Sequence, residues 1–187
     1  MASKSIYTVK YRRKREGKTN YKKRLDLLKG NTPRLVIRKS NSSMIAQIVT
    51  YHPDGDIVVA TFNSQKLSAF GWNYSKNSLP AAYLSGLVLA QKAKEKNISD
   101  AIVDLGLQLP KKGGRLYALL KGAIDGGLTI PVDEKVFPSE DRLQGEHIKS
   151  FSALKDLATA YKKNNLDISK LPDVFLSVKK NILGKGE

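Results

Sequence analysis

The sequence predicts an α/β fold in which helices pack on a small mixed sheet, with the element order β-β-β-α-β-α. Three patterns indicate this fold: strand-like runs joined by short turns, two segments with helical periodicity, and a short apolar run between those two segments. A basic extended N-terminal arm precedes the sheet, and a helical C-terminal extension follows it. We therefore divide the 187 residues into an arm (1–31), a central α/β domain (32–131), and an irregular segment plus helical extension (132–187).

The first three strands are expected at Arg34–Lys39, Met44–Tyr51 and Ile57–Asn63. Polar, turn-forming residues fill the connections at 40–43 and 52–56, so consecutive strands should pair antiparallel as a meander. The second run is apolar on both faces. This pattern is typical of a strand that lies in the middle of a sheet or is covered on both sides.

The first helix of the domain is expected over residues 79–96, with Ser78 as its N-cap and an apolar face along its length. A short buried strand follows at Ala101–Gly106. The order strand, helix, strand makes this strand part of a parallel crossover, so the sheet should be mixed. The second helix opens after the glycine-containing stretch 110–114, shows the clearest periodicity in the chain, and ends at Gly126.

Beyond the domain, residues 131–149 are expected to be irregular, with an acidic centre. Apolar residues at helical spacing then predict one amphipathic helix over 151–161 and another that begins near Pro172 and reaches Ile182. The sequence leaves two alternatives for these helices. They form a lid on the domain, or they form a tail that interacts with a partner.

The N-terminal arm is the most unusual stretch of the chain. Its first 29 residues hold eleven lysines and arginines against two acids, a formal charge of +9 out of +16 for the whole chain. Because like charges repel and few large apolar residues come before Leu25, we expect the arm to be disordered until it meets a polyanion, with a short helix around Leu25–Leu28 docked on the domain. Tyrosines among the charges suit stacking on bases while the cations contact phosphates. The alternatives are a solvated basic tail, a localisation signal or a membrane-surface patch.

Composition argues against several classes of function. The chain has no cysteine, which excludes disulfides, thiolate zinc sites and cysteine nucleophiles, and its two histidines make a structural zinc site implausible. No apolar run approaches the roughly 20 residues that a membrane-spanning helix needs, so we expect a cytoplasmic protein without a membrane partner. A net charge of +16 is typical of proteins that bind nucleic acids or anionic surfaces.

Catalysis is not expected either. Residues 17–19, Gly-Lys-Thr, look like the end of a phosphate-binding loop, but Arg12 occupies the position where that motif needs its first glycine. The acids Asp54, Asp56 and Asp104 do not converge on one strand end as the ligands of a two-metal nuclease do. We therefore expect no catalytic residues, no metal, no cofactor and no small-molecule substrate.

Three groups of residues are candidates for binding a polyanion. In the arm, Lys18 and the backbone of Gly17 can contact phosphates. On the first strand, Arg34 and Arg38 would share a face and continue the basic surface of the arm; the alternative is an edge strand whose charges face solvent. Residues 111–115 lead into a helix N-terminus, where free backbone N–H groups attract anions, although a plain loop with solvated lysines fits equally well.

Several long motifs resemble one family. The arm motif KYRRKREGKTNY at 10–21 and the strand motif PRLVIRKSN at 33–41 resemble the archaeal form of universal family eighteen, the 5S-rRNA-binding proteins of the large ribosomal subunit. The run GGRLYALLKGAIDGGL at 113–128 is similar to that family too. The resemblance spans nearly the whole chain to about His147 and weakens over residues 148–187.

The resemblance implies a non-enzymatic ribosomal protein that binds 5S rRNA through its arm and central domain and helps to dock it, with large-subunit rRNA, in the central protuberance. It also implies a neighbouring 5S-associated ribosomal protein, of family five. The alternative is a non-ribosomal basic protein that binds structured RNA, such as an assembly or tRNA-handling factor. The family's RNA contacts, carried onto matching positions, would be Arg12, Arg13, Lys14, Arg15, Lys18, Thr19, Tyr21, Arg24, Arg34, Arg38, Lys39, Ser40 and Asn41. Positions matching the family's glycine-rich loop are Gly113, Gly114 and Arg115.

Overall fold

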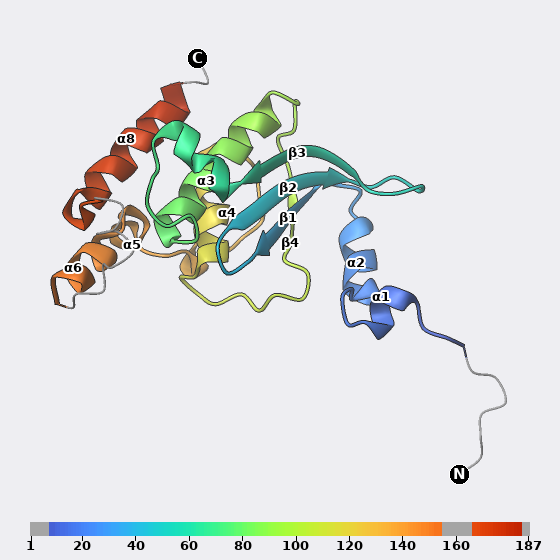
Figure 1. Cartoon of the computed structure of the whole chain (residues 1–187). Helices are drawn as coiled ribbons and strands as arrows, with labels where there is room; N and C mark the ends of the chain where they lie inside the picture. The colour runs from blue at the N-terminus through green and yellow to red at the C-terminus, as the bar shows by residue number, and fades with distance from the viewer. Residues whose placement is uncertain (1–7, 155–165, 185–187) are drawn as a thin grey trace, which may run out of the picture.

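The computed structural model of the chain describes residues 8–154 and 166–184 (Figure 1). It has the α/β architecture that the sequence predicts, with a four-stranded mixed sheet and helices packed on it. The elements in chain order are α1 (Arg12–Arg15), α2 (Tyr21–Leu28), β1 (Arg34–Lys39), β2 (Met44–Thr50), β3 (Ile57–Asn63), the 3-10 helix η1 (Ser64–Phe70), α3 (Leu79–Lys94), β4 (Ile102–Asp104), α4 (Arg115–Asp125), the 3-10 helix η2 (Glu134–Val136), α5 (Glu140–Gln144), α6 (Glu146–Leu154), the 3-10 helix η3 (Ile168–Lys170) and α8 (Leu171–Leu183).

The strands form one sheet in the order β3-β2-β1-β4. β1 pairs antiparallel with β2 and β2 with β3, whereas β1 and β4 are parallel. The predicted meander, the parallel crossover and the central position of β2 are confirmed. β4 is shorter than the predicted Ala101–Gly106, because the chain turns away from β1 at Gly106, whose φ of +61° belongs to the left-handed region.

Helix α3 packs on one face of the sheet, and α4 packs beside α3 (Figure 1). Alternate residues of the strands, among them Leu35, Ile37 and Ile48, are fully buried on this face. α3 is buried almost all the way round and not along one face as predicted, because the sheet, α4, α5 and α8 surround it. Its predicted N-cap is confirmed: the hydroxyl oxygen of Ser78 accepts a hydrogen bond from the N–H of Ala81 at 3.4 Å.

Glycines allow α3 and α4 to approach each other closely. A Cβ added at Gly86 would lie 2.1 Å from the carbonyl oxygen of Leu119, and one added at Gly122 would lie 2.0 Å from the carbonyl oxygen of Tyr83. A side chain cannot occupy either position unless the backbones move apart. The two helices are therefore in direct backbone contact, and this contact fixes the position of α4 relative to α3.

The C-terminal helix α8 packs on α3, so for the second of the two predicted helices the structure shows a lid on the domain. α8 begins at Leu171, with Pro172 in its first turn as predicted. Its residues Phe175, Val178 and Ile182 are buried in the same core as α3. The ring of Phe175 lies 5.6 Å from that of Tyr83, measured between ring centroids.

The segment at 131–149 is not irregular as predicted, because it contains η2, α5 and the start of α6. Gly145, with a φ of +90°, ends α5 in the left-handed conformation and lets α6 begin directly afterwards. α6 consequently starts at Glu146, earlier than the predicted helix over 151–161. The part of that helix beyond Leu154 lies outside the described residues.

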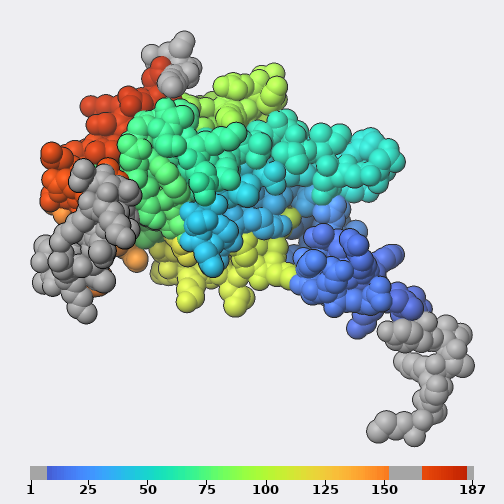
Figure 2. Space-filling model, in the orientation of Figure 1, coloured from blue at the N-terminus to red at the C-terminus, as the bar shows by residue number. Residues whose placement is uncertain are grey.

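The arm contains two short helices, α1 and α2. The sequence instead predicted that the arm is disordered in the absence of a polyanion. α2 starts at Tyr21, earlier than the short helix expected around Leu25, because the side chain of Asn20 caps it by accepting a hydrogen bond from the N–H of Lys23 at 3.1 Å. All residues of α1 and α2 are exposed or half-buried, with Leu25 59% exposed. Figure 2 shows the arm projecting from the body of the protein beside the segment that follows β4.

Candidate nucleic-acid interface

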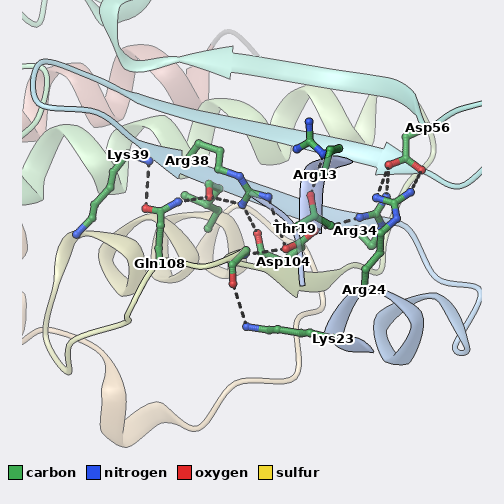
Figure 3. A network of polar contacts seen from close by, with 12 residues as sticks. Arg13, Thr19, Lys23, Arg24, Arg34, Arg38, Lys39, Asp56, Asp104 and Gln108 are labelled. Atoms are coloured by element: carbon green, nitrogen blue, oxygen red, sulfur yellow. Dashed lines mark hydrogen bonds and ion pairs between the residues drawn. The ribbon is translucent and has the colours of Figure 1, made fainter. Parts of the chain in front are cut away.

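A series of ion pairs joins α2 to the sheet (Figure 3). Arg24 of α2 donates two hydrogen bonds to the carboxylate of Asp56, at 2.9 and 2.8 Å. Asp56 precedes β3 and also accepts a hydrogen bond from Arg34 of β1 at 2.6 Å. Arg34 donates to Asp104 of β4 at 3.0 Å, and a guanidinium nitrogen of Arg38 lies 3.7 Å from the same carboxylate. We call these five residues the arginine–aspartate chain.

Arg34 does not belong to the exposed basic surface that the sequence predicted. Alternation along β1 places it on the same face as Arg38, but its side chain is only 2% exposed and both terminal nitrogens are bonded to carboxylates. Arg24 is occupied as well, because Asp56 binds it in a bidentate manner. Arg34 is therefore closed to a phosphate, whereas Arg24 is 34% exposed, lines the groove and keeps N–H groups that Asp56 does not bind.

Arg24 and Asp56 are both charged at neutral pH. Burial by itself raises the pKa of the Asp56 carboxyl, but the hydrogen bonds from Arg24 and Arg34 outweigh burial and leave this pKa below its ordinary value. The hydrogen bond to Asp56 raises the pKa of the Arg24 guanidinium, against the opposing effect of burial. The pair is therefore fully charged throughout the physiological pH range.

Arg38 differs from Arg34 because 45% of its side chain is exposed. Its Nη1 donates to the carbonyl oxygens of Ile37 and Asp104 at 2.8 and 2.9 Å, which holds the guanidinium beside the ends of β1 and β4. A hydrogen bond from the Gly106 N–H to the Asp104 carboxylate, at 2.8 Å, holds the turn after β4 in place. Lys23 of α2 reaches the same turn and donates to the carbonyl oxygen of Gly106 at 3.3 Å.

A groove of about 500 Å³ lies between the arm and this edge of the sheet. Arg13, Lys18 and Lys23 line it from the arm, and Arg38 lines it from β1. Cations on both walls of a groove suit a nucleic-acid backbone, whose phosphates they can contact from two sides. The groove therefore brings together predicted residues that are far apart in the sequence.

Five exposed cations lie in this part of the arm, and we call them the arm cations: Arg12, Arg13, Lys14, Arg15 and Lys18. Arg13 and Lys18 of this set line the groove. Glu16 is the acid nearest to them and pairs with Arg12 at 3.6 Å and with Lys18 at 2.8 Å. Arg13 donates to the hydroxyl of Thr19 at 2.8 Å. One acid among five cations leaves this part of the arm strongly positive, as a surface for phosphates requires.

Tyr11 and the predicted residue Tyr21 lie together in the arm. The ring centroids of Tyr11 and Tyr21 are 5.2 Å apart, with the ring planes tilted by 41°. Tyr11 is 73% exposed, so its outer face is free to stack on a base. The arm thus combines cations with an accessible aromatic ring.

Other predicted residues outside the arm form a second group around the β1–β2 turn. The side-chain amide of Asn77 donates to the carbonyl oxygens of Ser40 and Asn41, at 3.1 and 2.8 Å. The guanidinium of Arg115 donates to the carbonyl oxygen of Asn77 at 3.0 Å. Because Arg115 begins α4, the turn and the glycine-rich loop before α4 are held together through Asn77.

The glycine-rich loop leads into the N-terminus of α4, as the sequence predicts. Gly113 has a φ of +66°, and Gly114 occupies the N-cap position of α4 without a capping side chain. Lys39 and Arg115 line one hollow beside this loop, and His147 lines another. Burial, with a smaller contribution from the charge of Arg142, lowers the pKa of His147, so this imidazole is neutral at pH 7.

Sequence reasoning missed several residues on the face of the sheet opposite α3. Val36 and Gln47 are half-buried there, while Ile45 and Thr61 are exposed. They are paired across β1, β2 and β3, so they form a continuous surface next to Arg38. The period-two alternation of the strands contained this signal, because residues between the buried positions must lie on the other face.

The acids considered as candidate metal ligands have other roles. The side chain of Asp54 is 94% exposed in the β2–β3 connection, and Asp56 and Asp104 are bonded to arginines. Within the described ranges, no three histidines or acids are grouped so that they could hold a metal ion. Among the helices of the same ranges, none is long and apolar enough to cross a bilayer.

Known proteins match this chain over both the arm and the sheet. Residues 5–102 match the model of a family described as the ribosomal large subunit proteins 60S L5 and 50S L18. Over 189 aligned residues, the chain is 41% identical to the large ribosomal subunit protein uL18 of Korarchaeum cryptofilum (strain OPF8), and the alignment covers 97% of each of the two chains. The alignment therefore extends over nearly the whole chain, from the arm through the sheet to the helices packed on it.

Proposed function

This chain belongs to the family of large-subunit ribosomal proteins that includes uL18, and on that premise we propose that it binds 5S rRNA and helps to dock it, with large-subunit rRNA, in the central protuberance. The family is one of structural ribosomal proteins and not of enzymes. The observation that carries the proposal is the groove, because cations of the arm and of β1 face it from both sides. The motifs of the arm and of residues 113–128 support 5S rRNA as the partner.

RNA geometry explains how such a surface would act. An A-form helix has a deep, narrow major groove that side chains cannot enter, and it displays its phosphates and 2′-hydroxyls on the outside. In our proposal the arm cations contact phosphates, Tyr11 stacks on an unpaired base, and Arg38 supplies a further cation from the sheet. Recognition then depends on the shape of the RNA and on the arrangement of its backbone.

We propose two contact groups. The first consists of the arm cations and Thr19 around the groove, and the second consists of residues 39–41 and 113–115, which Asn77 holds together. Arg34 is left out of both groups because it is buried and bonded to two carboxylates, and Arg24 is left out because its two bonds to Asp56 hold α2 against the sheet. Their proposed role is to support the surface from within.

The remaining partners follow from the family resemblance. We propose that the chain contacts the second 5S-associated ribosomal protein, of family five, and that it acts in the cytoplasm as part of the ribosome. The resemblance alone supports these two statements. They are tested by co-sedimentation with large subunits and by pull-down of the family-five protein.

A competition titration tests the proposed RNA. Purified protein is titrated against labelled archaeal 5S rRNA at about physiological salt, with excess tRNA present, because purely electrostatic binding is weakened at that salt concentration. We expect tight binding that tRNA does not displace. If tRNA competes equally well, the protein has a general affinity for RNA, as a non-ribosomal assembly or tRNA-handling factor would, and the proposal fails.

A further inference from the structure

A negative charge stands inside the surface that we propose for RNA. Asp56 lines the groove together with Arg13, Lys18 and Arg38, and so does Asp104, whose carboxylate is bonded to Arg34. A carboxylate in this place repels phosphates, so by its charge alone it weakens RNA binding. Its contacts show a different role, because Asp56 connects the arm to the sheet through Arg24.

The attachment of α2 depends strongly on this one pair. No residue of α2 is fully buried, so burial of apolar surface holds the helix only through half-buried side chains such as Leu27 and Leu28. Lys23 makes one hydrogen bond to the Gly106 carbonyl oxygen at 3.3 Å, near the long limit for such a bond. The bidentate pair of Arg24 with Asp56, at 2.9 and 2.8 Å, is shorter and joins two full charges.

Asp56 is itself held in place by the sheet. Arg34 donates to it at 2.6 Å and is 2% exposed, so this arginine has almost no freedom to move. Arg34 is in turn bonded to Asp104, whose carboxylate also accepts from the Gly106 N–H at 2.8 Å. Although Asp56 lies in the β2–β3 connection, its carboxylate is therefore held by a buried arginine of the sheet.

We propose that Asp56 is a positioning residue for RNA binding. By holding Arg24 it sets the orientation of α2, and α2 sets where the arm cations and Lys23 stand relative to the groove and Arg38. An arm that is already docked loses less conformational freedom when RNA binds than a free arm does, so affinity is higher. This inference rests on the proposed function, and it explains why an acid is present where charge alone would disfavour one.

A matched pair of substitutions separates positioning from charge. Asp56→Asn and Asp54→Asn each remove one acid from the same β2–β3 connection, but the side chain of Asp54 is 94% exposed and its carboxylate lies 3.5 Å from the imidazole of His52. If charge alone matters, both variants bind 5S rRNA slightly more tightly than the unsubstituted protein. We expect this result for Asp54→Asn, whereas Asp56→Asn should bind about tenfold more weakly because a bidentate charged pair is lost. The salt dependence should stay unchanged in both, because the number of arm cations does not change.

A second pair covers the case in which Asp56→Asn destabilises the sheet around Arg34. Arg24→Gln leaves the bond between Arg34 and Asp56 in place, and Lys22→Gln removes the same charge from an exposed position on α2. We expect Arg24→Gln to bind about tenfold more weakly and Lys22→Gln to lose less than about threefold. Trypsin should also cut the arm faster in Asp56→Asn and Arg24→Gln than in their controls, which a purely electrostatic role would not cause.

The outcomes distinguish this inference from the proposed function. If the unsubstituted full-length protein prefers 5S rRNA but the members of each pair bind alike and are cut alike, Asp56 is not a positioning residue and the proposed function stands. If the unsubstituted protein does not prefer 5S rRNA over tRNA, the proposed function fails before any substitution is made, and the inference fails with it.

Discussion

Replacing Gly86 by alanine measures how closely α3 and α4 are packed. The added Cβ would lie 2.1 Å from the carbonyl oxygen of Leu119 and 2.8 Å from the nitrogen of Ala123, both of which are backbone atoms of α4. Because backbone atoms cannot rotate away, α4 must move by about 1 Å to restore ordinary contact distances. Overpacking of this kind costs about 3 kcal/mol, and the better helix propensity of alanine offsets about 1 kcal/mol of it. We expect the free energy of unfolding to fall by about 2 kcal/mol.

Urea denaturation followed by the fluorescence of Trp72, the single tryptophan and a fully buried side chain, measures this change. Gly30→Ala is the control, because a Cβ there would meet only the hydroxyl of Thr32 at 3.6 Å, and we expect it to change the free energy of unfolding by less than about 0.5 kcal/mol. Helix propensity alone predicts that Gly86→Ala stabilises the protein. An unchanged or raised midpoint for Gly86→Ala would refute the direct backbone contact between the two helices.

Three other perturbations test the surface and its support. Replacing all five arm cations by glutamine should reduce the slope of log affinity for 5S rRNA against log salt by roughly 4, since each phosphate contact contributes about 0.7 to 0.9; an unchanged slope would place the contacts elsewhere. Arg34→Ala should lower the free energy of unfolding by about 3 kcal/mol, because it leaves Asp56 and Asp104 without their buried partner; a loss below about 1 kcal/mol in urea denaturation would contradict that role. The pKa of Asp56 lies below its ordinary value of 3.8, so its contribution to stability is complete above that value and is lost only as the pH falls through the lowered pKa. Hydrogen exchange of the α2 amides, corrected for intrinsic rates, should therefore show constant protection from about pH 8 to pH 5, and a loss centred near neutral pH would argue against the Asp56 anchor.

Elements with a strong local pattern were predictable from the sequence. The apolar alternation of β1 and the helical spacing in α4 depend on residues close together in the chain, and both elements lie where they were predicted. Short elements with weak patterns were missed, among them η1 and α5, because a few residues provide too little periodicity. α3 was predicted as amphipathic, but its burial on all sides depends on α8, which comes much later in the chain.

The candidate site was predictable only in its composition. The sequence placed Lys18 in a basic arm and Arg38 on a strand that would continue the basic surface, and both line the groove. It gave no means of telling Arg38 from Arg34, because the two have the same side chain, lie on the same face of β1 and differ only in their neighbours. Arg34 is enclosed by Asp56 and Asp104, whereas nearly half of Arg38 is exposed.

The sequence by itself determined the net charge, the position of the basic arm, the strand and helix periods and the family motifs, because all of these are properties of the residues in order. Only the tertiary structure decided which cations are free and which are neutralised. Arg24 meets a carboxylate 32 residues further along, and Arg34 meets one 70 residues away. Electrostatic interaction depends on distance in space and on exposure to solvent, and neither can be obtained from positions along the chain.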